Sequence, residues 1–323
     1  RVRLRETMRG ASDVWATFHL VVPVVSTTFA SFDKLFGNLK REEIGWLLID
    51  EAGQAVPQAA VGAIWRSRRV IVVGDPLQLE PIVTMPRSMQ KTLAAKFRVS
   101  DAWLPGNTSV QELADRANRF GTLIGTGNKR VWVGSPLRVH RRCLNPMFSI
   151  ANEIAYDGLM VDGLKGIVDD CPLPASCWLN VQSTKSEGNW IPAEGIAAEN
   201  LIKNLIADGV NPADIYLISP FAHAAEKLRA LGRKHGIYTE QRKNAGTVHT
   251  TQGKQAEVVI LVLSGNAESD GARNWAASKP NLLNVAVSRA QKRLYVIGNR
   301  SSWAKRPFFK TAVARLANNG ADF

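Results

Sequence analysis

Short apolar runs alternate with amphipathic stretches along most of the chain. The runs are rich in β-branched residues and end in polar or glycine-rich turns, which is typical of strands in a parallel sheet joined by helices. The strands predicted in this way cover residues 21–25, 46–49, 70–73, 131–133, 178–181, 215–218, 258–263 and 294–297. The pattern therefore predicts an α/β fold.

Helical periodicity fills the intervals between these runs. Ser109 and Glu112 form a capping-box pair that predicts a helix over residues 109–120. Apolar residues repeat at i, i+4 over residues 199–208, and further helices are predicted over 145–156 and 222–231. Residues 265–280 are polar and are predicted to form a mobile loop.

Glycines interrupt the chain near its middle. Gly121, Gly125 and Gly127 precede the strand predicted at 131–133, where a second alternating series begins. The 323 residues are about twice the length of a typical domain of roughly 150 residues. We therefore predict two domains, residues 1–127 and 128–323.

The net charge and the cysteine content limit the partners and the cellular compartment that are expected for this chain. The net charge is +13, most of the excess lies after residue 125, and a polyanionic partner is expected. No apolar run approaches the roughly 20 residues of a membrane span, so no membrane partner is expected. The three cysteines, Cys143, Cys171 and Cys177, lack the spacing of a zinc site, and their odd number favours a reducing, cytoplasmic compartment.

Two adjacent carboxylates end the predicted strand at residues 46–49. Ligands bind at the carboxyl edge of parallel sheets, and nucleoside-triphosphate hydrolysis needs one carboxylate for magnesium and one for the attacking water. Asp50 and Glu51 are candidates for these two roles, with Asp50 as the metal ligand. The alternative is a solvated acidic strand end.

A second polar strand end follows residues 70–73 and is expected beside the first. It contains Asp75, Pro76 and Gln78. The amide of Gln78 can both donate and accept, which suits a group that senses the γ-phosphate or its water. The alternative for Asp75 and Gln78 is an ordinary turn, since Asp-Pro favours turns.

Five segments in order resemble the motifs of superfamily 1 helicases. Residues 50–54 and 74–81 resemble motifs II and III, and the Gly53-Gln54 ending resembles the branch that contains the nonsense-mediated-decay helicases. Residues 136–141 keep the Arg and His of that branch's Gln-Tyr-Arg-x-His-Pro segment. Residues 246–255 resemble motif V and residues 281–290 resemble motif VI. The resemblance begins near residues 25–28, which are similar to motif I-c.

This resemblance implies two RecA-like domains that clamp ATP and Mg²⁺ and move on single-stranded DNA or RNA. It implies that Arg138 and Arg289 reach the γ-phosphate. The alternatives for Arg138 are that the nearby Arg141 or Arg142 takes this role, or that these arginines form a solvated basic face. The alternative for Arg289 is a helix-terminal arginine that interacts with the local helix dipole. Positions implied to contact ATP are Asp75, Gln252, Gly253 and Gln255, and positions implied to contact the strand are Ser26, Thr27, Pro81, His249 and Thr250. The branch commonly has Glu at the position of Gln255, and an uncharged amide weakens any inference about ribose selectivity. Capping and turn formation are the alternatives for the strand contacts.

The 323 residues contain no Gly-x-x-x-x-Gly-Lys-Ser/Thr loop, on which the triphosphate normally rests. In the family this loop precedes motif I-c, so we expect that an upstream part of a longer parent supplies it and that the first RecA-like domain is incomplete here. Residues 70–73 would then form an apolar sheet edge. A nucleic-acid-binding module without hydrolysis is the main alternative function. A small-molecule ATPase or kinase fits the charge and motifs V and VI poorly.

Overall fold

The computed structural model describes residues 10–125, 130–167, 169–251, 253–266 and 268–319, and these residues form two compact units. Of these described residues, the first unit comprises those within 10–76, 80–121 and 132–135, and the second comprises those within 77–79, 122–131 and 136–319. The boundary predicted between residues 127 and 128 lies outside the described residues. None of the described helices is long and apolar enough to cross a bilayer.

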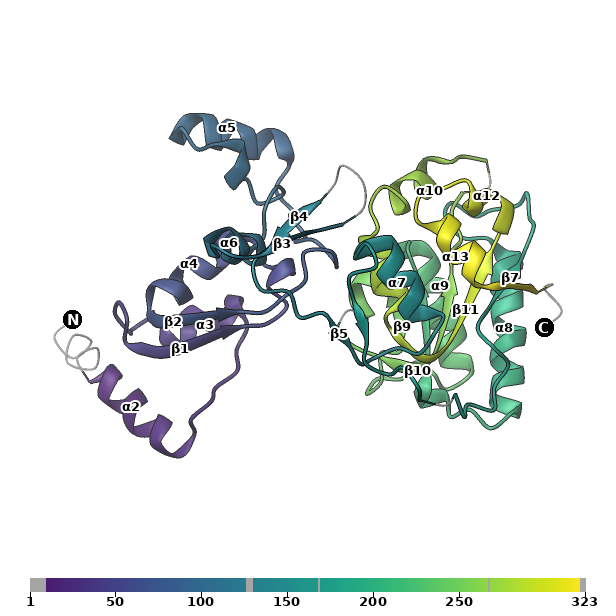
Figure 1. Cartoon of the computed structure of the whole chain (residues 1–323), viewed down its shortest axis with the longest axis horizontal. Helices are drawn as coiled ribbons and strands as arrows, with labels where there is room; N and C mark the ends of the chain where they lie inside the picture. The colour runs from purple at the N-terminus through teal and green to yellow at the C-terminus, as the bar shows by residue number, and fades with distance from the viewer. Residues whose placement is uncertain (1–9, 126–129, 168, 252, 267, 320–323) are drawn as a thin grey trace. The chain divides into compact units, whose positions relative to one another are not determined.

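The first unit contains a parallel pair of strands covered on one face (Figure 1). Phe32 and Phe36 pack with Leu47, while Ile49 packs with Ala60 and Val110. Its elements among the described residues are α2 (Ala11–Val21), α3 (Phe29–Phe36), β1 (Ile44–Ile49), the 3₁₀ turn η1 (Ala52–Gln54), α4 (Pro57–Trp65), β2 (Ser67–Val72), α5 (Arg87–Phe97), η2 (Asp101–Trp103) and α6 (Val110–Ala117).

The second unit is built on a six-stranded parallel sheet in the order β12-β7-β11-β10-β8-β9. Its elements include β7 (Cys177–Asn180), α8 (Pro192–Ala207), η3 (Pro212–Asp214), β8 (Ile215–Ser219), α9 (Ala222–Lys234), β9 (Ala245–Thr247), η4 (Val248–Thr251), β10 (Ala256–Val262), α10 (Gly271–Ala276), α11 (Asn281–Val287), β11 (Ala290–Gly298), α12 (Arg300–Ala304), α13 (Phe309–Arg315) and β12 (Ala317–Asn319). The short strands β3 (Thr122–Ile124) and β4 (Val131–Val133) follow α6 along the chain, and β5 (Val139–His140) and β6 (Val161–Asp162) flank α7 (Met147–Ala155). The predicted α/β fold is confirmed.

Helices cover both faces of this sheet. The chain crosses the sheet in one direction from β7 to β9 and returns from β9 to β11, so right-handed crossovers place the connecting helices on opposite faces. One layer contains α8 and α9, and the other contains α7 and α11. Every residue of β8 is buried, and so are residues 258–262 of β10, as expected for strands covered on both sides.

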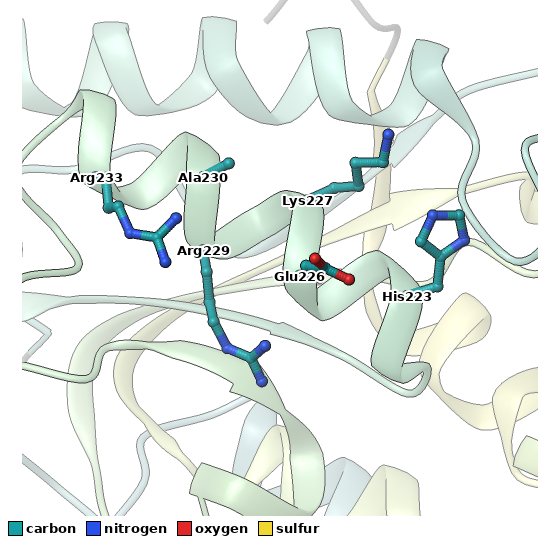
Figure 2. Close-up of a pocket in the computed structure, with 6 residues that line it drawn as sticks. All are labelled: His223, Glu226, Lys227, Arg229, Ala230 and Arg233. Carbon is teal, nitrogen blue, oxygen red and sulfur yellow. The ribbon is translucent and has the colours of Figure 1, made fainter.

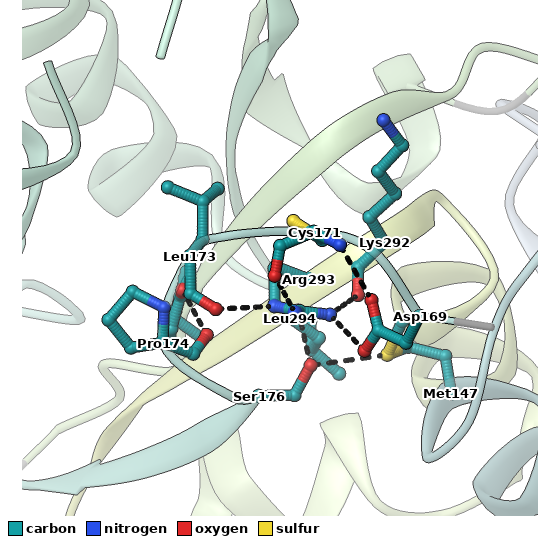
Figure 3. Close-up of polar contacts among 10 residues, drawn as sticks. Met147, Asp169, Cys171, Leu173, Pro174, Ser176, Lys292, Arg293 and Leu294 are labelled. Carbon is teal, nitrogen blue, oxygen red and sulfur yellow. Dashed lines mark hydrogen bonds and ion pairs between the residues drawn. The ribbon is translucent and has the colours of Figure 1, made fainter. Parts of the chain in front are cut away.

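Arg293 on β11 fixes the segment that leads into β7 (Figure 3). Its guanidinium is buried and donates to the Leu173 carbonyl at 3.1 Å, to the Cys171 carbonyl at 2.8 Å and to Asp169 Oδ2 at 2.7 Å. Hydrogen bonding to this guanidinium holds the pKa of Asp169 below its ordinary value. The two carbonyls and the carboxylate therefore supply the acceptors that this buried cation requires.

Several predictions of local structure are wrong. Residues 22–28 form no regular element, because α2 continues to Val21 and Pro23 has no N–H to donate to a strand ladder. The segment 265–280, predicted as a mobile loop, contains α10 with Arg273 buried in it. The helix predicted from residue 199 begins at Pro192, where proline suits the first turn.

Candidate nucleotide and strand sites

The carboxyl ends of β1 and β2 lie side by side in the first unit, as the sequence predicts. Ile49 is paired with Val72, and the Ala52 N–H donates to the Val73 carbonyl at 3.0 Å. A Cβ on Gly74 would lie 2.8 Å from the backbone nitrogens of Ala52 and Gly53. Glycine is therefore required for the two polar turns to approach this closely.

Asp50 and Glu51 occupy the first of these turns. Glu51 has φ 52° and ψ 36°, a left-handed conformation that is uncommon for a residue with a side chain. Its N–H donates to Asp50 Oδ1 at 2.8 Å, and Gln54 Nε2 donates to Glu51 Oε2 at 3.0 Å. Backbone strain of this kind concentrates at functional sites, and a solvent-exposed carboxylate such as Asp50 is a suitable ligand for a hydrated magnesium ion.

The motif III segment divides between the two units. Asp75 lies next to Gly53 in the first unit, since a Cβ on Gly53 would be 2.8 Å from the Asp75 carbonyl oxygen. Leu77–Leu79 belong to the second unit, where Asn284 Nδ2 donates to the Leu77 carbonyl at 2.9 Å and Asn281 Nδ2 donates to the Gln78 carbonyl. The structure thus brings Gln78 to the first turn of α11.

Asn284 was missed as a site residue by sequence reasoning. It is 1% exposed and also donates to the Tyr156 hydroxyl at 2.9 Å. Its three-residue spacing from Asn281 within an apolar helix is a signal that could have identified it, because such residues lie on one helix face.

Arg289 lies just beyond α11 and is engaged within the second unit. The residue is 1% exposed. Its guanidinium donates to the Val285 carbonyl at 3.1 Å, the Lys254 carbonyl at 2.9 Å and Ser288 Oγ at 3.2 Å. The Lys254 contact brings Arg289 to the turn that contains Gly253 and Gln255.

Arg138 differs from Arg289 in exposure. It is exposed, and its Nε donates to the Leu159 carbonyl at 2.6 Å. Arg141 and Arg142 are exposed as well. His140 is half-buried and accepts a hydrogen bond from the Cys143 N–H at Nε2, and burial lowers the pKa of its imidazole, with the nearby Arg142 charge lowering it further.

The other predicted site residues lie on turns. Thr250 in η4 is exposed, and its hydroxyl donates to the Thr247 carbonyl at 2.9 Å. His249 is half-buried, and burial lowers the pKa of its imidazole. Gly253 and Gln255 are exposed, and Gln252 lies outside the described residues. In the first unit Ser26 is exposed and Thr27 and Pro81 are partly buried. Among the residues that the structure describes, no three His, Cys, Asp or Glu side chains form a metal-binding group.

Two family models match this chain, each described as an AAA domain. One matches residues 135–301, more than half of the chain, and the other matches residues 10–86. The chain is 23% identical to the DNA replication ATP-dependent helicase/nuclease DNA2 of Gallus gallus over 293 residues, which cover 88% of this chain and 26% of that protein. It is 23% identical to the ATP-dependent helicase NAM7 of Saccharomyces cerevisiae, covering 85% and 27%.

The Regulator of nonsense transcripts 1 homolog of Arabidopsis thaliana is also 23% identical, covering 88% of this chain and 22% of that protein. The chain thus spans about a quarter of the length of these relatives. The solved structure of the PRRSV helicase matches 79% of this chain and 36% of its own at 13% identity, with a TM-score of 0.37. From the family matches and these relatives, the chain belongs to the superfamily 1 helicases, in the branch that contains the nonsense-mediated-decay helicases.

Proposed function

We propose that this chain is the motor portion of an ATP-dependent helicase that couples ATP hydrolysis to movement on single-stranded DNA or RNA. The observation that carries the proposal is the pair Asp50 and Glu51, placed at the carboxyl end of β1 beside the Val73–Asp75 turn, with Glu51 in a left-handed conformation. Ligands of parallel sheets bind at this edge, and paired carboxylates are what phosphoryl transfer to water requires.

Each carboxylate has its own role in this proposal. Asp50 would hold Mg²⁺, which neutralises charge on the phosphates when it is bound. Glu51 orients the attacking water and accepts its proton, and Gln54, which donates to Glu51 Oε2, keeps that carboxylate in place. Asp75 and Gln78 lie on the adjoining segment and report the state of the phosphates through their side chains.

Two arginines of the second unit complete the proposal. Arg289 must exchange its carbonyl and hydroxyl acceptors for phosphate oxygens, whereas Arg138 must leave the Leu159 carbonyl. A guanidinium matches the geometry of a phosphate and neutralises charge that develops in transfer. Gly253 and Gln255, in the turn next to Arg289, would contact the nucleotide, and we propose the same contact for Gln252.

The strand contacts are proposed for Ser26, Thr27, Pro81, His249 and Thr250. Hydroxyl, imidazole and backbone contacts to phosphate and sugar tolerate any sequence, as a translocating motor requires. The net charge of +13 supports a polyanionic partner, and binding should weaken as salt rises. We further propose that a segment outside these 323 residues supplies the phosphate-binding loop.

The test is strand-stimulated ATP hydrolysis by the full-length protein. Glu51→Gln should lower turnover by at least about 100-fold, because the general base is lost, while oligonucleotide binding is kept. Arg289→Ala should lower turnover by about 1,000-fold or more. Glu240→Gln, which neutralises an exposed carboxylate, is the matched control. Near-normal turnover in both site variants would contradict the proposal.

One observation favours the alternative of a binding module without hydrolysis. The buried Arg289 already satisfies its guanidinium within the fold, as a purely structural arginine does. Full-length protein that binds single strands in a salt-dependent way, yet hydrolyses no ATP in their presence, would establish that alternative.

A further inference from the structure

One exposed tryptophan is not among the residues proposed to contact the nucleotide or the single strand. Trp275 lies on α10 and is 54% exposed. Its ring centroid is 6.0 Å from that of Phe221, at an interplanar angle of 41°, and Phe221 is itself buried. Trp275 therefore rests on the core of the second unit while much of its surface faces solvent.

Buried polar contacts hold the segment that presents this ring. The Ser264 N–H donates to Glu194 Oε2 at 2.7 Å, and the Gly265 N–H donates to the Asn189 carbonyl at 3.1 Å. Gly265 has φ +96°, which other residues rarely adopt. In α10 itself, Arg273 is buried and pairs with Asp270 at 3.2 Å. These contacts anchor the chain on both sides of the segment that leads to Trp275, and a ring that is held in place before binding lowers the entropic cost of binding.

A basic helix face begins directly after Phe221. Residues of α9 line a hollow of about 550 Å³, and they are His223, Glu226, Lys227, Arg229, Ala230 and Arg233 (Figure 2). Ten residues of helix separate the first from the last, a rise of about 15 Å. Lys227 is paired with Glu187 at 3.1 Å, and the Arg233 guanidinium lies 5.3 Å from the Tyr238 ring centroid. Cations therefore outnumber the carboxylate among the lining side chains.

We propose that Trp275 and the basic face of α9 form an additional track for single-stranded nucleic acid, outside the predicted strand contacts. A base stacks on Trp275, and Arg229 and Arg233 contact phosphates beyond it. Exposed aromatic rings and cationic side chains along the path of the backbone bind single strands without sequence preference, whereas bases in a duplex offer no free face to stack. The proposal rests on the proposed function, because it extends the strand that a motor would hold.

The experiment measures binding of the 323-residue chain to a fluorescein-labelled oligo(dT) of about 25 nucleotides by fluorescence anisotropy. Trp275→Ala should weaken binding about 5- to 100-fold, and Trp275→Phe should retain most of the affinity because it keeps an aromatic face. The double variant Arg229→Ala/Arg233→Ala should lower the salt slope of log K by about 1.4, which is about 0.7 for each lost phosphate contact.

Matched control variants remove an exposed tryptophan or two exposed cations from other parts of the chain. Trp103→Ala removes a tryptophan that is 49% exposed in the first unit, and Lys305→Ala/Lys310→Ala removes two exposed cations of the second unit. Both should bind as the wild type does. Photocrosslinking with a 5-iodouracil oligonucleotide should label the peptide that contains Trp275.

The outcomes separate this inference from the proposed function. If Trp275→Ala and the double arginine variant bind like the wild type while His249→Ala/Thr250→Ala binds more weakly, the additional track is overturned and the proposed strand contacts stand. Equal losses in the controls would also overturn the track. A wild-type chain that binds no oligonucleotide would contradict both proposals.

Discussion

The two parallel sheets of this protein differ in how their apolar side chains are covered. In the second unit, Ile260 and Val259 of β10 are 0% exposed, with helices on both faces of the sheet. In the first unit, Trp46 and Leu48 of β1 are 55% and 69% exposed, and Ile71 of β2 is 43% exposed. Within the part of the chain that the structure describes, β2 pairs with β1 alone, so the predicted apolar edge is confirmed. A continuous apolar strand therefore does not by itself ensure two covered faces.

The difference implies unequal stability, because burial of apolar surface is the main favourable contribution to folding. The first unit buries one face of a two-stranded sheet, and isolated strand pairs are marginal in water. The second unit buries both faces of its central strands and also satisfies an internal guanidinium at Arg293. Four measurements test this expected difference in stability between the two units.

The largest difference is expected in amide hydrogen exchange. Backbone amides of β10 and β11 should exchange at least about 1,000-fold more slowly than those of β1 and β2, because the latter open with little loss of buried surface. Exchange followed by mass spectrometry on a monomeric sample measures this ratio. Slow, uniform exchange across residues 46–73 in that monomeric sample would contradict the prediction.

The second measurement compares two arginines. Arg293→Ala should lower the free energy of unfolding of the second unit by about 2–4 kcal/mol, because it leaves buried carbonyls without donors. Arg69, whose guanidinium lies 5.2 Å from the Trp46 ring centroid on the exposed face of the first unit, is the matched control. Arg69→Ala should cost less than about 1 kcal/mol. Chemical denaturation of both variants measures the two costs, and equal losses would contradict the comparison.

The third measurement uses pH. Glu194 is 1% exposed, and burial raises the pKa of its carboxyl from 4.5 to about 8. The folded state therefore binds more protons than the unfolded state between these values, and the stability that Glu194 contributes at low pH is lost as pH rises toward 8. Relative to Glu194→Gln, the wild type should lose up to about 1.4 kcal/mol per pH unit in that window.

Urea unfolding of the second unit at several pH values measures this slope. Glu240→Gln, which changes an exposed carboxylate of the same unit, should leave the slope unchanged. Parallel stability curves for the wild type and Glu194→Gln would show that the buried carboxyl has an ordinary pKa.

The smallest expected effect comes from helix caps. Ser109 Oγ accepts from the Glu112 N–H at the start of α6, and Asn299 Oδ1 accepts from the Ser302 N–H at the start of α12. Loss of either cap in Ser109→Ala or Asn299→Ala should cost about 1 kcal/mol. Because α6 packs on β2 and η1, the first variant should raise exchange about 5-fold in β1 and β2, whereas the second should leave β10 unchanged. Exchange confined to α6 would show that the first unit is more stable than we infer.

Much of the secondary structure of this protein could be predicted from local sequence patterns. Continuous apolar runs located β1, β8, β10 and β11, because strands buried in parallel sheets need no polar alternation. The capping box of Ser109 and Glu112 located the start of α6, because both residues bond to backbone groups within the same helical turn. The ordered motifs predicted the family, which the family models and relatives then confirmed, because these motifs combine residue types at spacings that chance rarely produces. The sequence also placed Asp50 and Glu51 at a strand end, where the structure has them.

The hydrogen-bond partners and the burial of these residues depend on the tertiary structure. The burial of Arg289 against the Lys254 carbonyl, the contact of Asn284 with Leu77 and the raised pKa of Glu194 all join residues far apart in the chain. Periodicity reports which side of an element is apolar, but it does not report which distant group supplies a hydrogen bond or removes water. For the same reason the sequence showed that β1 is apolar, and only the folded chain showed that one of its faces is left uncovered.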